Sequence, residues 1–296
     1  MPQDPPLRPS PTLKFLAGKH PLPVEPDLGH TPALHAFGRT DIGRTRQDNE
    51  DHFLVAEIDR VVKVDCSSFE LEQGTSWPVN RQARLLMVAD GIGGHTHGAV
   101  ASAVAVDAML EAVTAMPQRS ADDRALIEGL ESAVAHAQRR VASVAQRKAL
   151  RLNPGTTLTL AYVDWPTMLV AHVGDSRCYL VRNGALRQLT DDHTLAAAVE
   201  DMGAPTDGEM GKHVLLNAIG GGTDDLRVDL HRQRLERGDR VLLCTDGLHD
   251  LVPDHQILSI VDGSPDFMQA TDGLIGAALA AGGTDNVTAV LMQVAP

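Results

Sequence analysis

The amino-acid sequence predicts an α+β domain built in layers, because strands and helices fall in separate stretches of the chain. Early strands are followed by two long helices, a second run of strands, a polar loop region, two more strands, two helices and a last strand. Segregation of this kind favours antiparallel sheets with helices on their faces over a doubly wound parallel sheet. With 296 residues, 43% hydrophobic and 3% aromatic, the chain suits one large domain or two small ones, with a core mostly of Val, Leu and Ala.

Strands are predicted where apolar residues run continuously or alternate between turn residues. These segments are 35–40, 52–58, 84–89, 156–164, 168–175, 177–189, 226–231, 240–245 and 286–294. The segment 177–189 is a predicted hairpin, since Asn183-Gly184 supplies two positions that accept the positive φ angles of a type I′ turn.

Helices are predicted where apolar residues recur every three or four positions. These segments are 98–116, 122–149, 195–202, 254–262 and 266–281. The first is rich in alanine, and the second places Leu126, Leu130, Val134 and Val141 on one stripe. A helix with one apolar stripe should pack on a flat surface such as a sheet.

The chain divides into a leader and a folded domain. Residues 1–32 hold nine of the seventeen prolines and are predicted to be a disordered leader or linker, with a rigid docking segment as the alternative. The domain should therefore comprise residues 33–296. Within it, 59–83 reads as an enlarged loop with room for one more strand, and 190–225 is a polar, glycine-rich region.

Charge and composition exclude several classes of protein. A net charge of −13 argues against nucleic acid as a partner. No apolar run is long enough to span a membrane, and the N-terminus lacks the apolar core of a secretion signal. Cys66, Cys178 and Cys244 form no disulfide framework. We therefore expect a cytoplasmic protein.

Acidic residues stand where apolar strands end or begin, as in LLMVADGIGG (85–94) and RVLLCTDGL (240–248). The set comprises Asp90, Asp175 and Asp246 at strand ends, Asp285 before the last strand, and Glu50 with Asp51 before an early strand. Taken singly, Asp-Gly and Asp-Asn are common turn dipeptides whose carboxylates cap backbone donors. If the strands are neighbours, however, their ends should bring these acids into one place.

Carboxylates gathered in this way need a counter-charge. Two of them roughly 4 Å apart repel by about 4 kcal/mol at an effective dielectric near 20, so several are tolerated only with protons or cations between them. Oxygen-only clusters select hard cations such as Mg²⁺, Mn²⁺ or Ca²⁺. The sequence has no CxxC pair or HExxH helix to favour zinc. Gly91, directly after Asp90, would let its carbonyl approach a metal because it has no side chain.

Seven short motifs in order resemble the bacterial branch of the metal-dependent type 2C protein phosphatases. They are RTRQDNED, VADGIGG, GTT, VGDSR, LTDDHT, CTDGL and TDN, and the match extends from about residue 36 to residue 294. The resemblance implies a sandwich of two packed antiparallel β-sheets flanked by pairs of α-helices. It also implies hydrolysis of phosphoserine and phosphothreonine by a hydroxide held between metal ions, with two or three Mn²⁺ or Mg²⁺ ions bound.

The resemblance assigns a role to each matching residue, and region 190–225 matches the family's flap beside the active site. Among the metal ligands, Asp90 resembles the carboxylate that bridges two metals, Gly91 resembles the carbonyl ligand, and Asp246 and Asp285 resemble further ligands. Glu50 with Asp51 resembles the acidic pair near the metal waters, and Asp175 resembles a ligand of the third metal. Arg46 resembles the arginine that contacts the phosphate, and His95 is a candidate acid for the leaving group. Arg46 could instead pair with Asp48 or Glu50 on the surface, and a loop histidine such as His95 could simply be solvated.

Two departures from the family pattern leave alternatives open. Ile92 stands where animal members have a histidine, and Ala99 stands where bacterial relatives usually have a glutamate. The main hypothesis is a monomeric phosphatase that acts on proteins phosphorylated by a bacterial Ser/Thr kinase. The alternatives are a catalytically weak phosphoprotein-binding module of the same fold and a phosphatase dedicated to the phosphoserine of an anti-sigma-factor antagonist.

Overall fold

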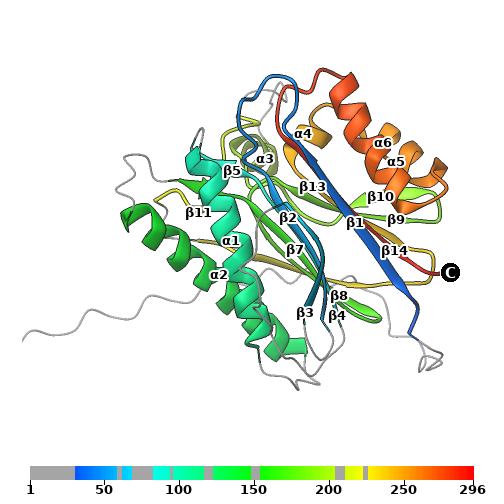
Figure 1. Ribbon diagram of the computed structural model, residues 1–296, viewed down its shortest axis with the longest axis horizontal. Helices are drawn as coiled ribbons and strands as arrows, with labels where there is room; N and C mark the ends of the chain where they lie inside the picture. Colours follow the sequence, from blue (N-terminus) through cyan, green and yellow to red (C-terminus); the bar gives the residue numbers. More distant parts are fainter. Residues whose placement is uncertain are drawn as a thin grey trace, which may run out of the picture.

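Two antiparallel β-sheets pack face to face between two groups of helices, as Figure 1 shows. The computed structural model describes residues 31–58, 62–68, 83–93, 96–116, 123–147, 154–203, 211–222 and 226–296. The predicted α+β class and the sandwich implied by the resemblance are both confirmed. The predicted leader falls outside the described residues, apart from its last two positions.

The larger sheet has six strands in the order β12-β8-β7-β4-β2-β3, and every neighbouring pair is antiparallel. Its strands are β2 (His52–Ile58), β3 (Val62–Ser67), β4 (Ala83–Ala89), β7 (Leu158–Asp164), β8 (Thr167–Val173) and β12 (Asp229–Arg234). Strand β3 is the additional strand for which the enlarged loop had room. Strand β12 begins and ends three residues later than the predicted segment 226–231.

The second sheet has five strands in the order β1-β14-β13-β9-β10, again all antiparallel. They are β1 (Leu34–Asp41), β9 (Arg177–Arg182), β10 (Ala185–Gln188), β13 (Arg240–Cys244) and β14 (Val287–Val294). The hairpin predicted at Asn183-Gly184 joins β9 to β10, and both turn residues have positive φ angles, 52° and 72°. The turn residues therefore determine the local pairing as predicted.

Helices cover the outer face of each sheet. The helices are α1 (Thr96–Thr114), α2 (Asp123–Arg147), α3 (Leu195–Asp201), α4 (Asp246–His249), α5 (Asp254–Gly263) and α6 (Phe267–Ala280). In Figure 1, α1 and α2 lie on one side of the paired sheets and α5 and α6 on the other. None of the helices in the described part of the chain is both long and apolar enough to cross a membrane.

The alternation of side chains along each central strand divides the core into three layers. In β2, Leu54 and Ile58 pack toward α1 and α2, whereas Phe53 and Val55 point between the two sheets. In β14, the odd-numbered Leu291 faces α4–α6, and its neighbours point between the sheets. Strands buried on both faces read as continuous apolar runs, which explains why runs such as LLMVA were recognisable in the sequence.

Strand pairing brings the acidic motifs to one end of the sandwich. In an antiparallel pair, the end of one strand lies beside the start of its neighbour. His52 at the start of β2 pairs with Ala89 at the end of β4, and Cys244 near the end of β13 pairs with Ala289 near the start of β14. The acids that precede or follow these strands are therefore neighbours in space.

Short elements that the sequence did not predict complete this end of the sandwich. A three-stranded sheet in the order β11-β6-β5 joins Gly91–Ile92, Gly155–Thr156 and Ile219–Gly220. Helix α4 begins at Asp246, directly after β13. Pairings of two residues and a helix of four are too short to produce a hydrophobic period, so sequence patterns could not indicate them.

The inter-sheet layer gives a first prediction. Leu86 of β4 is fully buried between the sheets, so Leu86→Ala should lower the free energy of unfolding by about 2–5 kcal/mol through lost contacts and a residual cavity. Denaturant unfolding of the two proteins measures the difference. Met268→Ala is the matched control, because Met268 is 48% exposed. Equal stability of the Leu86 variant and the control would contradict the three-layer packing.

Candidate active site

The acidic residues meet at a cleft of about 450 Å³ at one end of the sandwich. Its lining comprises Arg46, Glu50, Asp90, Gly91, Ile92, Gly93, Thr157, Asp175, His213, Leu215, Asp246, Thr284, Asp285 and Asn286. Seven of the nine residues singled out from the sequence are in this set. They come from five separate segments of the chain, which the antiparallel pairing described above brings together.

Asp51 lies beneath the cleft floor rather than on it. It is 1% exposed, and its Oδ2 accepts hydrogen bonds from the hydroxyls of Thr245 (2.8 Å) and Thr288 (2.7 Å). Its other oxygen, Oδ1, is buried and accepts no hydrogen bond from the described residues. The same holds for Oδ1 of Asp246. A buried carboxylate oxygen without a donor is costly in free energy, so both atoms favour a positively charged ligand at this point.

The backbone around Asp90 is held rigidly by two threonines. The amide of Asp90 donates to Oγ1 of Thr157 (2.9 Å), and its carbonyl accepts from the amide of Thr157 (2.9 Å) and from Oγ1 of Thr156 (2.8 Å). Next to it, a Cβ on Gly91 would collide with the carbonyl group of Gly98 in α1. Glycine is required here because the helix and the strand end approach each other so closely.

Asn286 organises the loop that leads into β2. Its Nδ2 donates to the carbonyls of Ile42 (2.9 Å) and Asp48 (3.0 Å), and its Oδ1 accepts from the amide of Glu50 (2.8 Å). One side chain thus fixes three points of the 42–50 loop, which contains Arg46. The carboxylate of Glu50, a residue that is 7% exposed, lies against Gly98.

Arg46 reaches across the cleft to Asp285. Its Nη2 lies 2.7 Å from Oδ2 of Asp285, and both side chains are partly exposed. The hydrogen bond from Arg46 to Asp285, ahead of the charges of Asp90 and Glu50, raises the pKa of the guanidinium. Neither alternative partner, Asp48 or Glu50, is the one to which the side chain hydrogen-bonds here. The guanidinium therefore sits at the cleft and interacts with the acidic cluster.

The electrostatics of the cleft reflect crowding of buried negative charge. Burial, together with the charges of Asp51 and Asp246, raises the pKa of Asp90 well above its ordinary value. Burial raises the pKa of Asp175 to about 8, with the charge of Asp246 adding to the effect. Burial also raises the pKa of Asp51, to about 7, and the pKa of Asp246. Protons or cations must neutralise such a cluster.

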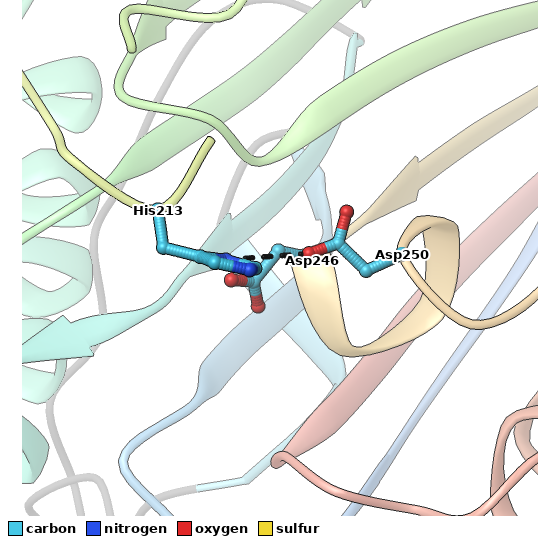
Figure 2. A group of neighbouring side chains, drawn as sticks. All are labelled: His213, Asp246 and Asp250. Atoms are coloured by element: carbon cyan, nitrogen blue, oxygen red, sulfur yellow. Dashed lines mark ion pairs between the residues drawn. The ribbon is translucent and has the colours of Figure 1, made fainter. Parts of the chain in front are cut away.

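The region predicted from its sequence to be a flap contributes a histidine. His213 points toward Asp246 and Asp250, as Figure 2 shows, and one ligand atom from each of the three lies within 4.8 Å of the others. His213 Nδ1 is 3.4 Å from Asp250, and Lys212 forms a second ion pair with the same carboxylate at 2.8 Å. These contacts join the flap to α4, which begins at Asp246.

Sequence reasoning missed the residues that support the acids. Thr157, Thr245, Thr288, Asn286 and His213 drew no attention because a threonine or asparagine beside a strand is ordinary. The motifs GTT, CTDGL and TDN contained several of them, so adjacency to a motif acid was the available signal.

His95 lies outside the described residues, and its predicted role as an acid stays a prediction. His193, in the motif LTDDHT, forms structural hydrogen bonds with Gly174 and Asp229.

Comparisons with known proteins address the family directly. The family model described as protein phosphatase 2C matches residues 73–290. The chain belongs to the protein phosphatase 2C family.

Its relatives within this family include bacterial enzymes. The serine/threonine protein phosphatase PstP of Mycobacterium tuberculosis is 35% identical over 216 residues, which are 72% of this chain and 40% of PstP. The chain thus matches less than half of the length of that relative. The serine/threonine phosphatase stp of Listeria innocua is 30% identical over 269 residues, covering 88% of this chain and 96% of stp.

A solved structure from the same family shares the fold. The catalytic domain of PstP in complex with two manganese ions is 31% identical, with a TM-score of 0.69 over 89% of this chain and 99% of that one. The chain therefore has the fold of a protein phosphatase 2C domain, and the acidic cleft is its candidate active site.

The crowded carboxylates predict a dependence of stability on pH. Several have pKa values above the value of about 4 that they have in an unfolded chain, so the folded protein keeps protons that the unfolded chain releases. Without divalent ions, the free energy of unfolding should therefore fall as pH rises from about 4 to about 8. Thermal unfolding in EDTA at several pH values measures this fall.

The variant Asp90→Asn tests whether repulsion among the cleft carboxylates causes this dependence of stability on pH. Asp90→Asn removes one of the repelling charges at nearly constant size, and it should raise the melting temperature in EDTA at pH 8 and flatten the pH dependence. Asp272→Asn is the control, because Asp272 is on the surface and pairs with Arg39. A fall in melting temperature for Asp90→Asn at pH 8 would show that repulsion does not dominate the cluster.

Proposed function

We propose that the protein is a serine/threonine protein phosphatase that uses two, and with Asp175 three, Mn²⁺ or Mg²⁺ ions to hydrolyse phosphoserine and phosphothreonine. The observation behind this proposal is the carboxylate-rich cleft, together with two buried carboxylate oxygens, one on Asp51 and one on Asp246, that have no donor among the described residues. Oxygen ligands of this kind suit hard divalent cations. A structural relative, PstP, has two manganese ions in its catalytic domain.

The donor set fits these ions. We assign the carboxylates of Asp90, Asp246 and Asp285 and the carbonyl of Gly91 to the central pair of ions, and Asp175 to the third. Gly91 lines the cleft beside Asp90, which supports its carbonyl as a ligand. Glu50 lines the cleft with these ligands, and Asp51 lies beneath the cleft, where its Oδ1 offers a hydrogen-bond acceptor to a water molecule.

The remaining residues bind and orient the substrate. When bound, the cations neutralise the phosphate dianion and lower the pKa of water so that it attacks phosphorus at neutral pH. Arg46 supplies two parallel N–H donors, which match the oxygens of a phosphate monoester. Its present partner Asp285 is a proposed metal ligand. With Asp285 holding a cation, the guanidinium of Arg46 would be available to bind the phosphate. His95 stays the proposed acid for the leaving group, because Ile92 has no proton to give.

We infer that the substrates are proteins phosphorylated by a bacterial Ser/Thr kinase and that the enzyme acts as a monomer in the cytoplasm. A catalytically silent binding module is disfavoured, because every central acid of the motifs is present and at the cleft. A phosphatase dedicated to an anti-sigma-factor antagonist is disfavoured by the relatives, which are named as serine/threonine phosphatases. Rates on several phosphoproteins would separate a general enzyme from a dedicated one.

Phosphate release from a phosphothreonine peptide with Mn²⁺ tests the proposal. Turnover should exceed that of Mn²⁺ alone and disappear in EDTA.

Asp246→Asn should lower kcat at least about a hundredfold, because a metal ligand loses its charge. Asp262→Asn is the control, since Asp262 lies at the end of α5 and is not part of the cleft. A folded wild-type protein without turnover would refute the function, and near-normal kcat of Asp246→Asn at saturating Mn²⁺ would refute that ligand.

Arg46→Ala tests the phosphate contact. Losing the bidentate donor should raise KM for a phosphopeptide by about tenfold or more and affect kcat less, since the charge-assisted bonds are made to the ground state as well. Arg39→Ala is the matched control, because Arg39 forms an exposed ion pair with Asp272 outside the cleft lining. If KM stays unchanged, the arginine does not grip the phosphate.

A further inference from the structure

A buried histidine outside the catalytic cleft connects the flap to the turn that holds Asp175. His193 is 8% exposed and lies between β10 and α3. Its ring touches the backbone of Gly174, which directly precedes Asp175, and the side chain of Asn217 in the flap segment, defined here as residues 211–217. His213 and Leu215 of the same segment line the cleft.

The hydrogen bonds determine which ring nitrogen holds the proton. The amide of Gly174 can only donate, and it lies 3.1 Å from Nδ1 of His193, so Nδ1 must accept. The amide group of Asn217 also donates to Nδ1, at 2.8 Å. The orientation of this asparagine is determined independently, since it donates to the carbonyl of Arg227 (2.6 Å) and accepts from the amide of the same residue (3.2 Å).

The other ring nitrogen is therefore protonated and donates to Asp229. Nε2 of His193 lies 3.1 Å from Oδ2 of this carboxylate. Arg227 also binds Asp229 with two donors, at 2.8 and 2.7 Å. Burial alone would raise the pKa of Asp229, but the hydrogen bonds from Arg227 and His193 lower it, so the carboxylate stays ionised. The ring of His193 is thus oriented from both nitrogens.

The main chain of His193 also connects the Asp175 turn with the flap segment. Its amide donates to the carbonyl of Gly174 (2.8 Å), and its carbonyl accepts from the amide of Leu216 (2.8 Å). Gly174 packs closely against Thr157, since a Cβ at this position would lie 2.6 Å from the Thr157 side chain, and its φ angle of +107° also requires glycine. Four hydrogen bonds that involve His193 therefore connect the Asp175 turn with the flap segment.

We propose that His193 is a positioning residue that makes the flap segment and the Asp175 turn a single mechanical unit. On this account, a cation that orders Asp175 also orders the flap, and a phosphoprotein that contacts His213 or Leu215 affects the geometry at Asp175. The inference deepens the proposed function and rests on it for the role of Asp175. It does not make His193 a catalytic residue, because the ring touches neither the cleft lining acids nor the substrate space.

Hydrogen–deuterium exchange with and without Mn²⁺ tests this coupling without measuring activity. In the wild-type protein, saturating Mn²⁺ should slow exchange of the peptide covering residues 211–217 by about threefold or more. His193→Gln should reduce this slowing by about half or more, because its longer amide reaches Asp229 and leaves the amide of Gly174 without its acceptor, while the two main-chain bonds of residue 193 remain. Slowing near Asp90 should be kept in the variant, since that part of the site does not depend on His193.

Two further variants keep the test decisive. His193→Asn ends at the level of Nδ1, so it can still accept from Gly174 and Asn217 and should retain most of the flap slowing. Asn217→Ala removes the side-chain bond between the flap segment and His193, leaves His193 bonded to Gly174 and to the amide of Leu216, and should reduce the slowing even if His193→Gln does not fold. A wild-type flap that does not respond to Mn²⁺ would overturn the proposal, as would equal slowing in wild type, His193→Gln and Asn217→Ala.

The outcome is distinguishable from a failure of the proposed function. A wild-type protein that releases no phosphate but shows Mn²⁺-dependent slowing in the flap, reduced in Asn217→Ala, would refute the activity and support the coupling. Normal phosphopeptide turnover with no difference in exchange among the variants would support the activity and refute the coupling.

Discussion

The repulsion among carboxylates gathered at one end of the sandwich is the constraint on which the rest of the site depends. Asp51, Asp90, Asp175 and Asp246 are close enough, and buried enough, to raise one another's pKa values. A structure optimised for stability alone would disperse them. The fold keeps them together with a rigid framework around them, and this combination is intelligible if the cluster exists to bind divalent cations.

The framework consists largely of small polar side chains on strands. Thr245 and Thr288 fix one oxygen of Asp51, and Thr157 fixes the backbone at Asp90 from β7's side of the sheet. Asn286 holds the loop that presents Arg46. Each of these groups is bonded to backbone or to a carboxylate in a buried setting, where a satisfied hydrogen bond restricts motion and an unsatisfied one is costly. This framework consequently restricts the motion of the acids.

The flap is connected to this framework at two points of different character. Lys212 and His213 form ion pairs with Asp250 near the cleft surface, and such contacts between partly exposed groups are weak and sensitive to salt. His193 forms buried, directional hydrogen bonds at the flap base. The geometry therefore combines a firm attachment at the base with looser contacts above the cleft. A surface that adapts to different phosphoproteins is compatible with that arrangement.

The order of the elements, the main strands and helices, and the identity of the acids could be predicted from the sequence, because buried strands leave continuous apolar runs and amphipathic helices leave periodic apolar patterns. The sequence also identified the hairpin at Asn183-Gly184, since few residues adopt positive φ angles. The resemblance, not periodicity, supplied the sandwich and the role of each acid. The tertiary structure alone decided what depends on strand register: that Asp51 lies below the cleft, that Arg46 meets Asp285, and that His213 and His193 join the flap to it. Such contacts join residues far apart in the chain, and no local pattern encodes which distant donor will meet a given acceptor.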